Sequence, residues 1–183
     1  MTCIAAVIQS GAVWMAADSA GVGGYSLHVR RDPKIYRVKD FLFGFTSSFR
    51  MGQILGYSFQ PPEMTVNQTI DEYMATSFIN SLRQALKDGG FAKIKDGEDQ
   101  GGTFLVGFRG RIFTIYDDFQ VGENLHPIAA VGCGFDLALG SLFSTPDKPA
   151  RERLETALKA AETFSAGVRG PFIYELLEAK EKE

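Results

Sequence analysis

The order in which strand-like and helix-like segments follow one another constrains the fold of this chain more than any other feature. Short runs rich in β-branched and aromatic residues, bounded by turn residues, predict early strands at 2–9, 12–17, 34–38 and 41–45. Apolar residues at steps of three and four then predict helices at about 49–57 and 70–88. Further strands are expected at 103–108, 112–116 and 128–131.

The C-terminal third follows the same segregated pattern. It predicts a helix that runs through Leu142, a long helix from about 145–146, and a final strand at 172–177. Strands and helices in separate blocks favour an α+β fold over a doubly wound parallel sheet. Hairpin-length connections in the first block indicate antiparallel pairing.

Three smaller features sharpen this outline. Thr69 followed by Glu72 predicts a capping box. Segments 19–25 and 93–101 are expected to be loops, and the charged tail 178–183 is expected to fray. The last long helix should bury a stripe of apolar side chains, namely Leu154, Ala157, Leu158, Ala161 and Phe164.

Length and charge limit the classes of function. The 183 residues (20.1 kDa) suit one domain, 1–183, and the formal net charge of −3 offers no polycationic surface for nucleic acid or an anionic membrane. No apolar stretch is long enough to span a membrane. The two cysteines, Cys3 and Cys133, do not form a disulfide framework, so a reducing, cytoplasmic location is expected.

The common catalytic motifs are absent from the sequence. It contains no phosphate-binding loop, no Gly-x-Ser-x-Gly elbow and no His-Glu-x-x-His zinc helix. His28 and His126 stand alone, without metal-ligand spacing. The sequence therefore implies no cofactor or metal and does not favour a histidine-based mechanism.

The N-terminus carries the strongest chemical signal. Methionine aminopeptidase removes an initiator Met that precedes a small residue, and Thr2 qualifies. A free N-terminal threonine combines a hydroxyl nucleophile with an α-amine whose pKa, about 7.7–8.0, suits a base near neutrality. Such a nucleophile needs a nearby cation, an acid that orients the cation, and an oxyanion donor.

Candidates for these roles occur in order along the chain. Asp18 ends the second strand in Ala-Ala-Asp, Lys34 opens the next in Lys-Ile-Tyr, and Gly44 lies in Phe-Leu-Phe-Gly-Phe. Gly-Cys-Gly at 132–134 precedes a helix, and Ala-Ala-Glu-Thr-Phe-Ser-Ala-Gly spans 160–167. With these residues the chain resembles the N-terminal-threonine peptidases, the proteasome β-subunits and HslV, over nearly its whole length.

The resemblance implies a four-layer α/β/β/α sandwich and a set of residue roles. Thr2 would attack the peptide carbonyl, Lys34 would lower the pKa of the α-amine, and Asp18 would hold Lys34. The backbone N–H of Gly44 would stabilise the oxyanion. The amine end would be supported by three further residues: Cys133, Glu162 and Ser165.

The resemblance also implies partners. Family members form stacked rings that enclose the sites and receive unfolded protein or peptide substrates from an ATP-dependent unfoldase, so a homo-oligomeric ring is expected. Because Thr2 directly follows Met1, no propeptide is expected, as in HslV.

Alternatives remain at this point. Asp18 also fits a turn cap, Lys34 and Glu162 fit solvated positions, and Cys3 and Cys133 fit small buried residues. Cysteine stands at 133 where the family has serine, and Glu162 replaces an aspartate. The open alternatives are an inactive shell subunit of the same fold, which has lost activity or is blocked by retained Met1, and an amidohydrolase of small amides with the same nucleophile.

Overall fold

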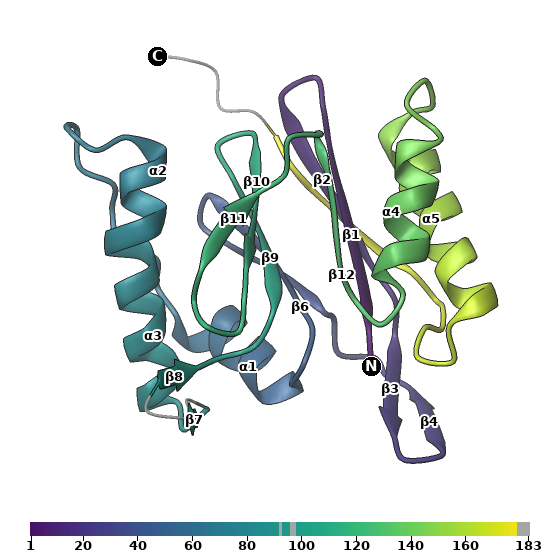
Figure 1. The fold of residues 1–183 in the computed structure, drawn as a ribbon, viewed down its shortest axis with the longest axis horizontal. Helices are drawn as coiled ribbons and strands as arrows, with labels where there is room; N and C mark the ends of the chain where they lie inside the picture. The colour runs from purple at the N-terminus through teal and green to yellow at the C-terminus, as the bar shows by residue number, and fades with distance from the viewer. Residues whose placement is uncertain (92, 96–97, 179–183) are drawn as a thin grey trace.

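The computed structural model describes residues 1–91, 93–95 and 98–178, and these build four layers. In Figure 1, helices α1–α3 cover one side of a five-stranded sheet, a four-stranded sheet stacks on its other side, and α4 and α5 cover the far face. The predicted α/β/β/α sandwich with two stacked antiparallel sheets is confirmed.

The four-stranded sheet carries the N-terminus. Its order is β12-β1-β2-β13, and all of its pairs are antiparallel. The strands are β1 (Cys3–Gln9), β2 (Ala12–Ala17), β12 (Ile128–Gly132) and β13 (Ile173–Leu177). Cys3 pairs with Gly132 in register, so the start of the chain lies against the end of β12.

The five-stranded sheet has the order β11-β10-β9-β6-β5 and is also antiparallel. Its strands are β5 (Ile35–Val38), β6 (Phe41–Phe45), β9 (Phe104–Phe108), β10 (Arg111–Ile115) and β11 (Val121–Glu123). β5 begins directly after Lys34, whose carbonyl oxygen accepts from the N–H of Phe45 at the end of β6 at 3.0 Å.

Helices flank the two sheets. On the side of the five-stranded sheet lie α1 (Phe49–Gln53), α2 (Ile70–Tyr73) and α3 (Ile79–Asp88), extended by the π-helical turns η1 (Ile54–Ser58) and η2 (Met74–Phe78). On the other side lie α4 (Phe135–Phe143) and α5 (Ala150–Phe164). The predicted capping box of Thr69 and Glu72 is present at the start of α2.

Three apolar clusters fill the spaces between layers. Strand β1 contributes to two of these clusters, because successive side chains of a strand point to opposite faces of the sheet. Its side chains that face α4 and α5 are Cys3, Ala5 and Val7, and those that face the other sheet are Ile4 and Ala6. The third cluster, under α1–α3, is rich in aromatic rings, including Phe41 stacked on Phe108 at 4.2 Å between centroids. Burial on both faces makes β1 a rigid support for the residues at its start.

Some boundaries differ from the predictions. The expected loop at 19–25 contains β3 (Ala20–Gly23), which pairs with β4 (Ser26–Val29) in a hairpin that projects from the layers. Its glycines pair through the backbone and give no strand-like apolar pattern. Short strands β7 (Lys93–Lys95) and β8 (Glu98–Gln100) likewise occupy the expected loop at 93–101, of which residues 96–97 lie outside the described residues. Strand β11 was not predicted.

The last long helix starts later than expected. It begins at Ala150 because Pro149 takes an extended conformation (φ −57°, ψ 144°) and a proline disfavours helical geometry at the residue before it. Four residues of the predicted stripe are buried, but Phe164 is 77% exposed, because it is the last helical residue and turns away from the sheet. Most of the predicted frayed tail, 179–183, lies outside the described residues.

In the described part of the chain, no helix combines the length and apolarity needed to cross a membrane.

Candidate active site

Asp18 and Lys34 form a buried ion pair where the two sheets meet. Asp18 follows β2 and Lys34 precedes β5, and the Lys34 Nζ lies 2.7 Å from the Asp18 Oδ1. Each residue is 1% exposed. A buried lysine and a buried carboxylate are rare without a partner, so the pair excludes the solvated strand end that was the alternative for Lys34.

Asp18 is fixed by more than the lysine. Its Oδ1 also accepts a hydrogen bond from the N–H of Cys3 at 3.0 Å, and its Oδ2 accepts from the N–H groups of Ala20 (2.9 Å) and Arg169 (3.1 Å). Both oxygens act only as acceptors, which is the role of an ionised carboxylate. Asp18 thus ties together three segments distant in sequence and fixes the position of Lys34.

Burial lowers the pKa of Lys34, while the charge of Asp18 and its hydrogen bond oppose that shift. The Lys34 Nζ also lies 5.9 Å from the centroid of the Phe49 ring, an aromatic face that attracts a cation. Lys34 is therefore a cation in a nearly dry environment, held by the carboxylate of Asp18.

Thr2 lies beside this pair, because the residue that follows it, Cys3, donates its backbone N–H to Asp18. The N–H of Cys3 that reaches Asp18 belongs to the peptide bond that joins Thr2 to Cys3. Thr2 is 5% exposed, and the N–H of Cys133 donates to its carbonyl oxygen at 2.8 Å. The Thr2 hydroxyl donates to the carbonyl oxygen of Met1 at 2.6 Å. The structure thus brings together the predicted nucleophile, cation and orienting acid.

Cys133 stands beside the Thr2 nitrogen. The Thr2 N–H donates to the Cys133 Sγ at 3.2 Å, and the sulfur lies 3.6 Å from the Thr2 carbonyl oxygen. Cys133 is exposed, which excludes the buried structural position considered from the sequence. In contrast, Cys3 is fully buried, and burial raises the pKa of its thiol to about 12, so Cys3 is a core residue.

Two glycines that sequence reasoning did not single out make room for the N-terminus. Gly132 has φ +99°, and a Cβ there would collide with the carbonyl oxygen of Thr2. A Cβ on Gly167 would lie 2.6 Å from the Cys133 Sγ and 2.7 Å from the Met1 Cβ. Gly132 belongs to Gly-Cys-Gly, and Gly167 ends the segment 160–167, so their places in these two motifs were the available signals.

Ser165 and Glu162 act on a loop rather than on Thr2. Ser165 ends α5, and its hydroxyl accepts from the N–H of Gly167 at 3.4 Å. A Glu162 oxygen accepts from the N–H of Gly170 at 2.8 Å and lies 4.0 Å from the guanidinium of Arg169. Neither side chain has a hydrogen bond to Thr2 within the described residues. The predicted direct support of the amine end is corrected: both residues hold the loop whose Arg169 N–H reaches Asp18.

Gly44, the predicted oxyanion donor, lies inside β6, paired in register with Ile35 and Leu105. The N–H of Phe45 donates to Lys34 on the β5 side, so the Gly44 N–H points to the β9 side and belongs to the sheet ladder. The structure thus places Gly44 within the sheet, because the strand continues one residue beyond it, and its role as oxyanion donor stays a prediction.

The turn that follows β6 lies closer to Thr2 than Gly44 does. A Cβ at Gly132, the position that abuts the Thr2 carbonyl, would also lie 3.3 Å from the Cγ2 of Thr46. Ser47 follows in the left-handed region (φ 62°), and Ser48 caps α1. The Ser48 N–H donates to the Thr46 carbonyl oxygen at 2.6 Å, which leaves the N–H groups of Ser47 and Phe49 as further candidates for the oxyanion donor beside Gly44.

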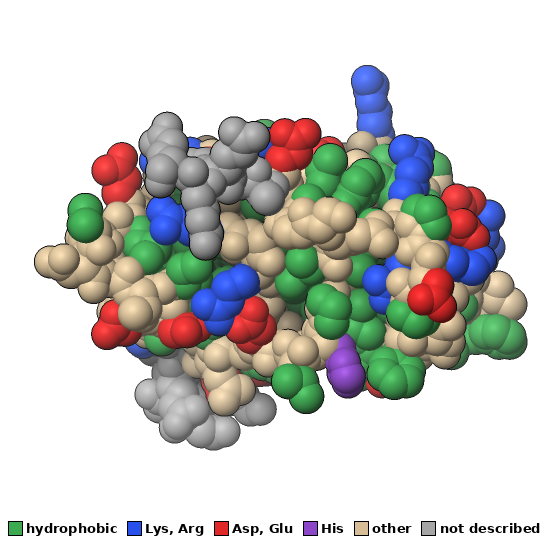
Figure 2. Space-filling view, turned by 90° about the horizontal axis from the view of Figure 1, so that it is seen from above, with side chains coloured by type: hydrophobic (Ala, Val, Ile, Leu, Met, Phe, Trp, Pro, Cys, Tyr) green, Lys and Arg blue, Asp and Glu red, His purple; other side chains and the backbone are tan. Residues whose placement is uncertain are grey.

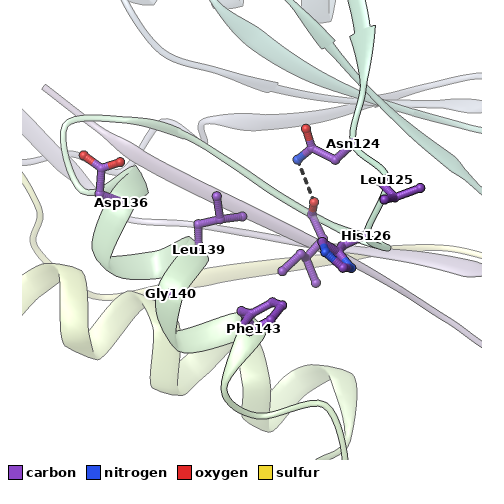
Figure 3. Close-up of a pocket in the computed structure, with 8 residues that line it drawn as sticks. Asn124, Leu125, His126, Asp136, Leu139, Gly140 and Phe143 are labelled. Carbon is purple, nitrogen blue, oxygen red and sulfur yellow. Dashed lines mark hydrogen bonds between the residues drawn. The ribbon is translucent and has the colours of Figure 1, made fainter.

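A cavity of about 430 Å³ lies apart from this cluster. Figure 3 shows it between α4 and the segment 124–128, with Leu139 and Phe143 on one side and His126 on the other. In the space-filling view, hydrophobic side chains surround a histidine at the edge of the upper face (Figure 2). None of the predicted site residues lines this cavity, so it is not the candidate active site.

Metal ligation has no geometric basis in the described part of the chain, where no group of three or more His, Cys, Asp or Glu side chains could hold an ion. His28 lies on the exposed strand β4, and the ring of His126 packs edge-on against Phe143 at 5.5 Å.

Solved structures share this fold over nearly the whole chain. Thiobacillus denitrificans BPH in complex with epoxomicin has a TM-score of 0.81 at 23% identity, covering 98% of this chain and 100% of that chain. HslV from Trypanosoma brucei has a TM-score of 0.67 at 18% identity, with 97% and 99% covered. Anbu, an ancestral β-subunit, from Yersinia bercovieri has a TM-score of 0.66 at 15% identity, with 96% and 81% covered.

No protein-family model and no curated protein matches the sequence. At these identities the structural likeness shows the fold alone, which this chain shares with BPH, HslV and Anbu.

Proposed function

We propose that this protein is a threonine-type endopeptidase whose nucleophile is Thr2, exposed by removal of Met1. The observation that carries the proposal is the buried Asp18–Lys34 pair, 2.7 Å apart, whose carboxylate also accepts from the peptide N–H directly after Thr2. The likeness to BPH in complex with epoxomicin and to HslV supports the same reading of the fold.

In the proposed reaction, the Thr2 Oγ attacks the peptide carbonyl and gives its proton, through a water molecule, to its own α-amine. The amine must be neutral to accept that proton. A nearby ammonium disfavours a second positive charge, so Lys34 lowers the pKa of the amine, and Asp18 keeps Lys34 charged and in place.

The attack forms a tetrahedral intermediate whose oxyanion is stabilised by a backbone N–H group of Gly44, Ser47 or Phe49. The amine then protonates the leaving nitrogen, and an ester between the substrate acyl group and the Thr2 Oγ remains. A water molecule, deprotonated by the same amine, hydrolyses the ester and restores Thr2.

The proposed substrates are unfolded proteins or peptides. The resemblance to proteasome β-subunits and HslV supports self-association into stacked rings and delivery of substrates by an ATP-dependent unfoldase. Light scattering on the purified protein tests the first of these points, because a ring requires a mass several times that of one chain.

The test of the activity compares peptide hydrolysis by the wild type with that by two Thr2 variants. Thr2→Ala should lower kcat by at least ~10³-fold, whereas Thr2→Ser, which keeps a hydroxyl and an α-amine, should retain measurable activity. Thr65→Ala, on an exposed loop, is the matched control and should leave kcat unchanged. Equal rates for the wild type and Thr2→Ala would refute the proposal.

A blocked, inactive subunit is the second candidate, and one observation favours it. Met1 packs against Gly167 and Cys133, and its carbonyl accepts the Thr2 hydroxyl. Intact-mass measurement separates the two candidates: a protein that retains Met1 in its native host is the blocked subunit.

A further inference from the structure

A cavity of about 420 Å³ opens between the two sheets on the β12 side of Thr2. One wall carries hydroxyl groups, and the opposite wall is apolar, formed by Val131 of β12 and by Phe135 and Leu139 of α4. The hydroxyl-bearing residues are Thr46, Ser47, Thr103, Thr114 and Tyr116. We call this the intersheet cavity. Its size is within the range of sites that bind small ligands or single side chains.

Thr114 is the feature of this cavity that points to a ligand. Phe113 and Ile115, its neighbours on β10, face the helices, so alternation along the strand turns Thr114 toward the space between the sheets. Thr114 is only 7% exposed, and its hydroxyl has no hydrogen-bond partner in the described part of the chain. The hydroxyl opens into the cavity, so a molecule that enters the cavity can donate a hydrogen bond to it or accept one from it.

Two of the other hydroxyls differ in this respect. Thr46 donates to the carbonyl oxygen of Thr103 at 2.6 Å, and the Ser47 hydroxyl lies 3.3 Å from the Thr103 N–H. The hydroxyls of Thr103 and Tyr116, like that of Thr114, have no hydrogen bond within the described residues, and Thr114 is the most buried of these three residues.

The intersheet cavity adjoins the proposed nucleophile. Gly132 lines it and lies at the carbonyl oxygen of Thr2, because a Cβ on Gly132 would collide with that oxygen. Thr46, which also lines the cavity, lies on the other side of Gly132, 3.3 Å from the position of such a Cβ. A different cavity, of about 420 Å³, lies on the Lys34 side, where Phe49 forms part of its wall. A peptide that crosses Thr2 therefore has a separate space on each side.

Among the residues that the structure describes, no lysine, arginine, aspartate or glutamate lines the intersheet cavity. A charged side chain placed there would lose its hydration without gaining a counter-ion, whereas an uncharged side chain would gain apolar contact and one hydroxyl partner. We propose that the intersheet cavity binds an uncharged substrate side chain next to the scissile bond and that Thr114 determines this selectivity. This inference rests on the proposed peptidase function.

The first test is independent of hydrolysis. In the Thr2→Ala protein with labelled threonine methyl groups, N-acetyl-leucine amide is titrated and the Thr114 methyl signal is followed by NMR. We expect a saturable shift at Thr114, none at the exposed Thr65, and none at Thr114 with N-acetyl-aspartate amide. An unmoved Thr114 signal at the solubility limit of the leucine derivative, or equal shifts with both compounds, would overturn the inference.

The second test uses hydrolysis by the wild type and two variants. With peptides that vary one residue on either side of the scissile bond, the wild type should disfavour Asp and Lys by about 10-fold or more at one position. Thr114→Phe fills the cavity and should lower kcat/KM for Leu at that position by about 10-fold while sparing Gly. Thr114→Val keeps the shape and should lower kcat/KM only for Ser, Thr, Asn and Gln there, by about 5-fold.

The outcomes separate the two proposals. If the wild type cleaves none of the peptides, the proposed function fails, and the NMR titration alone decides the binding site. If the wild type cleaves peptides but both Thr114 variants keep the wild-type preferences, the peptidase function stands and the role of the intersheet cavity is refuted. Thr65→Val, an exposed hydroxyl removed elsewhere, is the control for both readouts.

Discussion

The Asp18–Lys34 pair should contribute far more to stability than any exposed ion pair of the same length. Asp18→Ala leaves the Lys34 ammonium buried without a partner and also removes the acceptor of three backbone N–H groups. We expect a loss of about 3–5 kcal/mol in the free energy of unfolding. Lys34→Met leaves a carboxylate that still accepts three N–H groups, so its loss should be smaller, about 2–3 kcal/mol.

The double variant Asp18→Ala/Lys34→Met measures the coupling energy between the two side chains. With both charges removed, no unpaired ion remains, so its loss should be less than the sum of the single losses by about 2–3 kcal/mol. Urea unfolding of the four proteins at one protein concentration measures this coupling. The exposed pair of Glu155 and Lys159, 2.6 Å apart on α5, is the control and should show a coupling of only about 0.3–0.5 kcal/mol. A coupling for Asp18 and Lys34 as small as that of the control would refute the reasoning.

Three further predictions concern the surroundings of the site. Gly132→Ala should destabilise the protein by at least ~2 kcal/mol in thermal unfolding, because a Cβ at φ +99° collides with Thr2; an unchanged Tm would contradict the geometry. Glu162→Ala should lower kcat by about 10-fold by loosening the loop that bonds to Asp18, while Glu162→Gln, which keeps an acceptor for Gly170, should restore most of it; equal losses would exclude this route. Because burial raises the pKa of the Cys3 thiol from 9.0 to about 12, the folded state retains a proton that the unfolded state loses, so stability should fall as pH rises above 9. Cys3→Ala should flatten that decrease in unfolding measured between pH 8 and 11, and an unchanged slope would show that Cys3 is not its source.

The sequence predicted the four layers and the Asp18–Lys34 pair. The patterns that indicate them lie within short segments or follow one another in a fixed order along the chain. Alternation and helical spacing mark β1, β2 and α3, and the contexts of Asp18 and Lys34 place both at strand ends. What the sequence did not predict depends on backbone conformation. The hairpin β3–β4 is built from glycines that pair through the backbone, and the position of the Gly44 N–H depends on where β6 ends and on which neighbour it faces.

The supporting residues of the site were less predictable. Glu162 and Ser165 were found by resemblance, but their action through the loop to Arg169 depends on long-range contacts that no local pattern carries. Gly167 contacts Cys133 only because α5 ends beside the N-terminus. Thr114 lay in a correctly predicted strand, yet its free hydroxyl becomes visible only once the two sheets are stacked.

Mapping the product of an epoxyketone reaction tests the central claim most directly. Epoxomicin offers two electrophilic carbons, which one residue carrying both a free α-amine and a hydroxyl can attack together. Mass spectrometry of the treated, digested protein should find one inhibitor per chain, bound to the peptide that begins at Thr2, and none in Thr2→Ala. An adduct on any other residue, including Cys133, or an untouched N-terminal peptide that begins at Thr2 would contradict the claim that this residue supplies both groups.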